Sequence, residues 1–165
     1  MDNNLEAIKE QVYSKCALNI SNFKIESESK AYDACKFKLN ESNVICRSSK
    51  VTPKKAGQFV TFWKRNENGL IVPFNENDVV DFFIVNVRTE NRFGQFVFPK
   101  SVLVRKGILS TSEKDGKRAF RVYASWDDTN SKQAEKSQKW QLNYFYEIKG
   151  KMDYKRIAEL YSMSI

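Results

Sequence analysis

The sequence contains no histidine among its 165 residues. This absence excludes Ser-His-Asp and Cys-His nucleophilic sites and any histidine general base. Cysteine is also scarce, because Cys16, Cys35 and Cys46 are widely spaced and form no Cys-x-x-Cys pair, so a metal site is not expected. Neither the GxGxxG nor the GxxxxGK[ST] phosphate-binding pattern occurs. Any reaction would depend on carboxylates, lysines and a hard cation such as Mg²⁺.

Long hydrophobic runs are missing as well. The longest, Val79–Val87, is interrupted by Asp81 and Asn86, whereas a membrane-spanning helix needs about 18 continuous apolar residues. The N-terminal segment 1–16 lacks the continuous apolar core of a signal peptide. We therefore expect a cytoplasmic protein without a membrane partner, whose cysteines are reduced structural thiols. Length and the 41% hydrophobic content favour one folded domain over residues 1–165, and the oligomeric state stays open.

Hydrophobic periodicity predicts a helix, five or six strands, a short helix, a further strand and two more helices. The fold class is therefore α+β (mixed α/β), with a mixed or mostly antiparallel central sheet of five to seven strands and flanking helices. The order is compatible with a restriction-endonuclease-like core. The predicted helices are 4–15, 101–106, 131–147 and 154–161. The predicted strands are 35–39, 44–48, 58–65, 70–72, 81–87, 95–98 and 119–123, and 21–28 is predicted to be a polar connection.

Positive charge is abundant and clustered. The net charge is +8, and the segment from Ser42 to Asn66 holds six basic residues and no acidic one. The segment from Asn91 to Ser112 adds four more basic residues, again without an acidic one. Aromatic and β-branched residues interleave the first cluster. Clustered charge beside aromatic faces suits phosphate backbones and stacked bases, so the sequence predicts a surface that binds nucleic acid.

The segment KVTPKKAGQFVTFWKR supplies the first candidate residues. We expect Lys50, Lys54 and Lys55 to contact phosphates from a loop. Trp63 on the adjoining strand could stack on a base, and Gln58 could bind base edges. The alternative is a solvated loop beside a strand that buries Trp63 in the core. Lys64 is a further predicted phosphate contact.

A second group of candidates follows in the chain. Pro99 places Lys100 at the start of a helix, where backbone amides favour anions. In the strand at 119–123, alternation puts Arg121 and Tyr123 on the face of Ala119, opposite Phe120 and Val122. Each of these residues could instead be ordinary surface. The remaining candidates on this part of the chain are Arg118 and Trp126.

Asp81 and Lys100 raise an enzymatic alternative. They lie on successive predicted strands, as the aspartate and lysine of restriction-endonuclease-like nucleases do. Such nucleases bind Mg²⁺ with a second carboxylate two residues before the lysine, and here that position is Phe98. Glu6, Glu10 or Glu76 could substitute from elsewhere. Asp81 could equally be a structural carboxylate at a strand end.

Several motifs in order resemble the MepB family: KVTPKKAGQFVTFWKR, the Asp81-Phe82-Phe83 strand, GQFVFPKSVLVRKGILS, KRAFRVY, Trp126-Asp127 and SQKWQLNYF. The resemblance runs from about Ala31 to Tyr146. It implies a small bacterial cytoplasmic protein, named from a gene beside a multidrug efflux pump, and it implies no established reaction. The family motifs coincide with many of the candidates above and also include Gln95 and Trp140.

The leading hypothesis is a non-catalytic protein that binds DNA or RNA in a basic groove, with no cofactor. Lys50, Lys54, Lys55, Lys64 and Lys100 would meet phosphates, while other candidates, including Arg121, Tyr123 and Trp126, would line the groove. One alternative is a Mg²⁺-dependent nuclease that uses Asp81 and Lys100. Another is a regulatory or ligand-binding module linked to drug efflux, which would show an apolar pocket in place of an open basic cleft.

Overall fold

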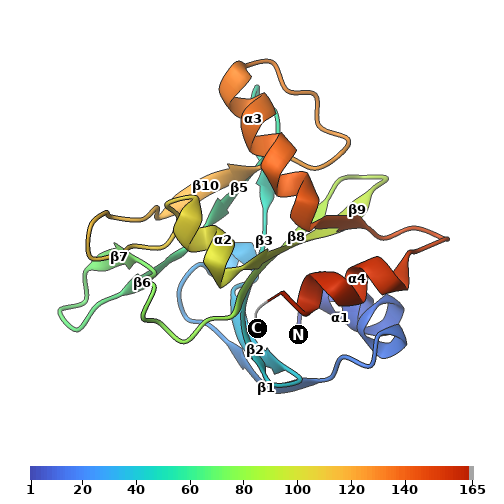
Figure 1. Ribbon diagram of the computed structural model, residues 1–165, viewed down its shortest axis with the longest axis horizontal. Helices are drawn as coiled ribbons and strands as arrows, with labels where there is room; N and C mark the ends of the chain where they lie inside the picture. Colours follow the sequence, from blue (N-terminus) through green and yellow to red (C-terminus); the bar gives the residue numbers. More distant parts are fainter. Residues whose placement is uncertain (164–165) are drawn as a thin grey trace.

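A six-stranded sheet forms the centre of the computed structural model, which describes residues 1–163 (Figure 1). Only one pair of neighbours, β3 and β8, is parallel, and the other pairs are antiparallel. The predicted α+β class with a mixed central sheet is therefore confirmed. The strands in spatial order are β1 (Ile20–Ile25), β2 (Cys35–Leu39), β3 (Ser42–Ser48), β8 (Phe82–Arg88), β9 (Phe93–Pro99) and β11 (Phe145–Glu147).

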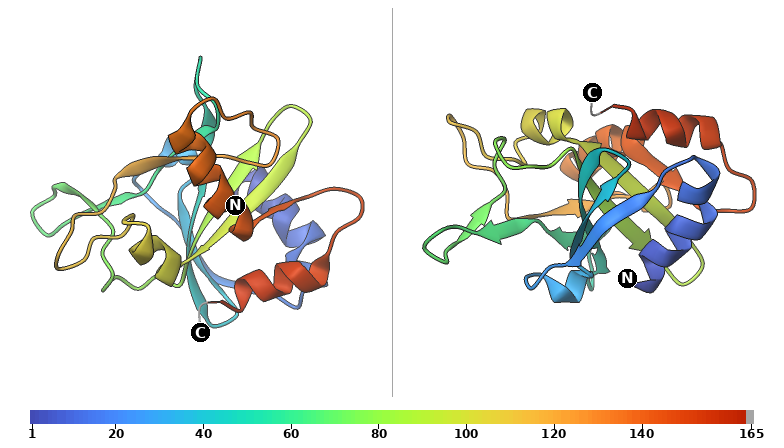
Figure 2. Two further views of the ribbon diagram at one scale, coloured as in Figure 1. Left: turned by 45° about the horizontal axis from the view of Figure 1, so that its top comes forward. Right: turned by 90° about the horizontal axis from the view of Figure 1, so that it is seen from below.

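Two smaller sheets and four α-helices complete the fold. The three-stranded sheet has the order β10 (Ala119–Val122), β5 (Gln58–Thr61), β4 (Lys50–Val51), and the hairpin pairs β6 (Trp63–Arg65) with β7 (Ile71–Pro73). This hairpin projects from the rest of the molecule (Figures 1 and 2). The helices are α1 (Asn3–Gln11), α2 (Lys100–Arg105), α3 (Lys132–Gln141) and α4 (Tyr154–Tyr161), with 3-10 turns at Tyr13–Lys15, Lys30–Tyr32 and Leu142–Tyr144. None of the helices within residues 1–163 is long and apolar enough to cross a membrane.

The middle strands β3, β8 and β9 of the central sheet are mostly buried, and alternate residues of β8 point to opposite sides. Phe82 and Ile84 join a core that α1 and α4 cover, and these two helices lie on the same side of the sheet (Figures 1 and 2). Phe83 and Val85 join a second core beneath β5, β10, α2 and α3. The surface between β10, α3 and the loop before β5 lies on this second side.

The first core contains a buried polar network. Tyr161 on α4 contacts the hydroxyl of Tyr13 at 3.0 Å, and it also donates a hydrogen bond to the side-chain oxygen of Gln95 on β9. Tyr146 donates a second hydrogen bond to that oxygen, at 2.5 Å. Burial raises the pKa of Tyr13, Tyr146 and Tyr161 far above the usual value near 10. The hydroxyls therefore stay neutral and tie α4 to the sheet.

Three predicted elements were wrong. The segment expected to be a polar connection forms β1, whose pairing with β2 is irregular between Ser21 and Lys24, with a positive φ of 53° at Asn22. This bulge removes the alternation that would have indicated a strand. The expected strand 58–65 is two strands, because Trp63 leaves the three-stranded sheet to pair with Pro73 on β7.

The third error concerns the helix expected over 131–147. The α-helix ends at Gln141, and after a 3-10 turn Phe145 pairs with Phe96 at the edge of β9. Pairing with a sheet edge therefore outweighs the helical pattern of the sequence. Phe145 contacts the second core as a residue of a strand and not of a helix.

Candidate nucleic-acid interface

A basic concave surface lies between β10, α3 and the loop before β5. It consists of two adjoining hollows of about 360 Å³ and about 180 Å³, which share Arg121, Tyr123, Ser131 and Ala134. We call them together the basic groove. Five cationic residues line it and no acidic one does: Lys54, Lys55, Lys106, Lys117 and Arg121. The aromatic, amide and hydroxyl side chains in its lining include Tyr123, Asn130, Ser131, Gln133, Ser137 and Trp140.

Strand β10 forms the floor of the groove as the sequence predicted. Val122 is buried in the core and Phe120 packs against Phe98 at 6.2 Å between ring centroids, whereas Arg121 and Tyr123 face the groove. One edge of β10 pairs with β5. Gln141 of α3 covers the other edge by accepting a hydrogen bond from the Tyr123 amide at 2.8 Å and donating one to the Arg121 carbonyl at 3.0 Å.

Arg121 holds in place the loop before β5, which carries Lys54 and Lys55. Its guanidinium donates to the carbonyls of Ala56 and Gly57 and to the Thr52 hydroxyl, at 2.8 to 3.1 Å. The loop also has two left-handed residues, Lys54 with φ 65° and Gly57 with φ 74°. These contacts fix the backbone from which both lysines of the loop extend, so Arg121 shapes the groove as well as contributing its charge.

The N-terminus of α3 opens into the groove. Ser131 caps this helix by accepting a hydrogen bond from the Ala134 amide at 3.1 Å, and both residues line the two hollows. The positive end of the helix dipole therefore adds to the charge of Lys54 and Lys55.

The charge of Arg121 acts on the nearby carboxylate of Asp127. This carboxylate accepts a hydrogen bond from the Ala124 amide at 2.8 Å. Burial raises the pKa of Asp127, and the amide together with the charge of Arg121 offsets this rise only in part. Because its carboxylate is bound to the backbone, Asp127 does not line the groove.

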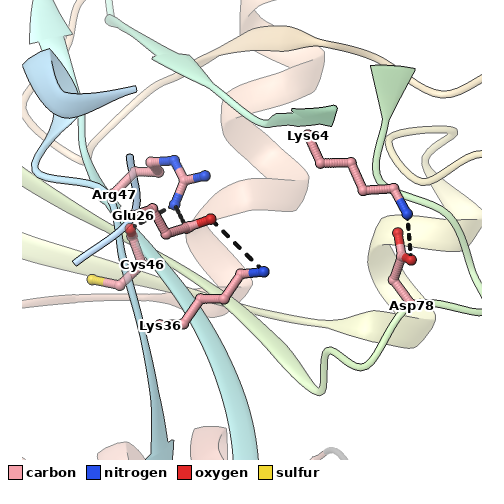
Figure 3. A network of polar contacts seen from close by, with 6 residues as sticks. All are labelled: Glu26, Lys36, Cys46, Arg47, Lys64 and Asp78. Carbon is pink, nitrogen blue, oxygen red and sulfur yellow. Dashed lines mark hydrogen bonds and ion pairs between the residues drawn. The ribbon is translucent and has the colours of Figure 1, made fainter. Parts of the chain in front are cut away.

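Several cations of the first charge cluster lie outside the groove and have acidic partners (Figure 3). Arg47 is fully buried and its guanidinium contacts Glu26 at 2.6 Å, while Lys64 contacts Asp78 at 2.6 Å. Arg65 pairs with Glu28 at 2.9 Å. By contrast, none of the five groove cations forms an ion pair within residues 1–163. The groove therefore keeps its charge, whereas Arg47, Lys64 and Arg65 are neutralised by acidic partners.

The lysines predicted on the first cluster and at the start of α2 thus have different environments. Lys54 and Lys55 line the groove, whereas the Lys50 ammonium lies 5.2 Å from the ring centroid of Tyr32 outside it. The Lys100 ammonium donates a hydrogen bond to the Asp78 carbonyl at 2.8 Å, beside the ion pair of Lys64. Lys64 and Lys100 therefore both contact Asp78 and lie outside the groove.

The predicted binding residues Gln58 and Trp63 make contacts within the fold. Gln58 is buried and binds the Ser49 hydroxyl and the Arg88 carbonyl, which leaves its amide no access to a base. Trp63 is half-buried beneath the Arg65 guanidinium, 5.5 Å from the ring centroid.

Trp126 and Arg118 also lie outside the groove. Trp126 packs against Phe145 at 5.6 Å and lies beneath Arg92, and its indole N–H has no hydrogen-bond partner within the described chain. Arg118 is exposed beside Lys117. Four of the predicted binding residues therefore line the groove: Lys54, Lys55, Arg121 and Tyr123.

The groove also contains residues that the predicted site omitted. Lys106 follows α2, and its ammonium lies 5.3 Å from the ring centroid of Trp140 on α3. Lys117 lies two residues before the predicted strand of Arg121, and Gln133 lies in the first turn of α3. The alternation of β10 could have identified Lys117. Nothing in the sequence, however, indicated that α3 would dock along the free edge of β10.

Asp81 and Lys100 do not form a nuclease-like pair of side chains. The Asp81 carboxylate accepts hydrogen bonds from the backbone and side-chain amides of Asn43, at 2.7 and 3.2 Å. Lys100 meets Asp81 only through a backbone hydrogen bond of 2.9 Å, and Phe98 is buried in the core. Within residues 1–163, no three His, Cys, Asp or Glu residues are grouped so that they could hold a metal ion.

A separate hollow of about 370 Å³ lies beside β1 and the N-terminus. It combines apolar and charged residues of both signs, and it contains none of the predicted site residues. Its lining consists of Asp2, Phe23, Ile25, Lys30, Asp33, Ala34 and Cys35.

Comparison with known proteins places the chain in a family. A family model described as MepB-like matches residues 26–147. A solved structure described as the crystal structure of MepB is 34% identical, covers 92% of this chain and 100% of its own, and has a TM-score of 0.79. A bacterial homing endonuclease, I-Ssp6803I, shows 17% identity over 84% of this chain and 86% of its own, with a TM-score of 0.47, which is too low to carry an argument. No curated protein matches the sequence. The resemblance noted in the sequence is thus confirmed, and the chain belongs to the MepB-like family.

Proposed function

We propose that the protein binds nucleic acid through the basic groove. The observation that supports this function is the concentration of five unpaired cations around one concave surface without an acidic residue in its lining. These cations come from three distant segments of the chain: the loop before β5, the residue after α2, and β10 with the residues just before it. Like charges held together cost stability unless a ligand neutralises them, and a polyanion neutralises several at once.

The groove differs from a general anion site in its aromatic and amide side chains. Tyr123 and Trp140 offer ring surfaces, and Gln133 offers an amide in the same hollow. Bases stack on aromatic rings and hydrogen-bond to amides, whereas a simple anion such as phosphate uses neither ring. The lining therefore favours nucleic acid over a small inorganic anion.

A double substitution, K54S/K55S, tests the proposal. Binding of a fluorescent oligonucleotide is measured by anisotropy over a range of salt concentrations. The wild-type affinity should fall linearly with the logarithm of salt, and the variant should lose about 1.4–1.8 from the slope because two phosphate contacts disappear. The matched control is K9S/K15S, which removes the same charge around α1, on the opposite side of the central sheet.

The proposal fails if the wild type does not bind at micromolar concentration, or if binding does not change between about 50 and about 300 mM salt. It also fails if the control variant weakens binding as much as K54S/K55S does. Incubation of labelled DNA and RNA with Mg²⁺ or Mn²⁺ addresses the nuclease alternative. Cleavage that disappears in Asp81→Ala would replace the binding function with catalysis.

A further inference from the structure

We infer that the basic groove selects single-stranded nucleic acid over duplex. This inference rests on the proposed function and specifies the form of its ligand. The groove divides into a smaller hollow, lined by Lys54, Lys55 and Arg121, and a larger hollow that contains both aromatic rings. A strand lying along it would place a phosphate in the first hollow and the neighbouring base in the second.

The size of the larger hollow supports this assignment. Its volume of about 360 Å³ lies at the lower end of the range for small-molecule sites, which provides room for one base with its sugar. A duplex keeps its bases stacked inside, so a base could enter only by leaving the stack, at a cost of a few kcal/mol. An unpaired strand presents its bases without this cost. The hollow therefore favours single strands by the free energy of unstacking and unpairing.

Tyr123 is held as a fixed platform at the junction of the two hollows. Its ring lies against Gly57, where an added Cβ would be 2.6 Å from the Tyr123 Cδ1 atom. Its backbone amide is bound to Gln141 of α3. The ring thus has little freedom to lose when a base stacks on it, which increases the contribution of stacking to affinity.

Trp140 provides the second ring, at the far side of the larger hollow. One side of the indole contacts Phe98, with ring centroids 5.4 Å apart, and the Lys106 ammonium lies near the ring. Lysine has a flexible four-carbon stem, so Lys106 can move from the indole to a phosphate while a base takes its place. The two aromatic residues and the cations at both ends therefore match the alternating base and phosphate of an extended strand.

The test compares equal lengths of single-stranded DNA, single-stranded RNA and duplex DNA, together with a mononucleotide as competitor. For the wild type we expect a single strand to bind at least ~10-fold more tightly than the duplex, since stacking of one base contributes about 1–3 kcal/mol. Quenching of tryptophan fluorescence should accompany single-strand binding. The mononucleotide should compete only at concentrations far above those of the oligonucleotide.

Ser137→Tyr gives a variant that fills the larger hollow from the half-buried outer part of α3 without changing charge. It should lower single-strand affinity at least ~10-fold and reduce the preference for single strand over duplex. Ser14→Tyr, an exposed position beyond α1, is the control. Circular dichroism confirms that both variants are folded.

Each outcome decides between the two proposals. Equal affinity for single strand and duplex overturns the single-strand inference and leaves nucleic-acid binding in place. A mononucleotide that competes as well as the oligonucleotide also overturns it, because the groove is then a nucleotide site. Equal loss in Ser137→Tyr and Ser14→Tyr has the same consequence. Absence of binding to every polynucleotide defeats the proposed function itself.

Discussion

Gly57→Ala should destabilise the protein through the wall of the basic groove. Gly57 has φ 74°, and an added Cβ would lie 2.6 Å from the Tyr123 ring and 2.7 Å from the Val122 carbonyl oxygen. The left-handed backbone alone costs a non-glycine residue about 1–2 kcal/mol. Overpacking against a ring and a strand carbonyl adds about 1–3 kcal/mol. The expected loss in the free energy of unfolding is therefore about 2–5 kcal/mol.

Gly69→Ala is a control that separates these two contributions. Gly69 has nearly the same φ, 77°, but no atom lies within 4 Å of its added Cβ. Gly69→Ala should therefore lower the free energy of unfolding only by the cost of the left-handed backbone, about 1–2 kcal/mol. Urea denaturation of both variants, followed by circular dichroism, measures the difference. Equal losses would show that the Tyr123 ring moves away freely and that the groove is not rigid at this point.

Two further perturbations concern ion pairs outside the groove. Glu26→Gln should lower the free energy of unfolding by about 3 kcal/mol, because it leaves the charge of Arg47 buried and uncompensated, whereas Arg47→Met should cost less. Urea denaturation compares the two variants, and a larger loss in Arg47→Met would contradict the reasoning. The hydrogen bond from Arg92 lowers the pKa of Glu147 below its usual 4.5, so this pair stabilises the fold above that pH and the contribution disappears as pH falls through the lowered pKa. Glu147→Gln should therefore show a shallower loss of stability on acidification than wild type in thermal melts, and identical pH profiles would refute this.

The sequence predicted best the elements whose pattern is local. The last helix begins at Tyr154 and ends at Tyr161 as expected, because apolar residues recur along one face. The hairpin turn at Asn66–Gly69 also depends on local chemistry, because the Asn66 side chain accepts hydrogen bonds from two backbone amides and Gly69 has a positive φ. Strand β1 was missed because its bulge removes the alternation, and β11 was missed because pairing with the distant strand β9 defines it.

The binding site shows the same division between local and distant information. Alternation along 119–123 groups Arg121 with Tyr123, and both line the groove, although Phe120 lines it as well. By contrast, the role of Gln58 depends on Arg88, 30 residues away, which accepts its hydrogen bond. The role of Trp126 likewise depends on Phe145 of β11, a strand that the sequence did not reveal.

Charge clustering along a chain and charge clustering in space are different properties, and only the second defines a binding surface. The segment from Ser42 to Asn66 has no acidic residue, yet Glu26, Glu28 and Asp78 fold against it and neutralise half of its cations. A salt bridge that is already formed must break before its cation can bind a phosphate, which subtracts from affinity. Cations without such partners have no salt bridge to break, so the basic groove should dominate polyanion binding.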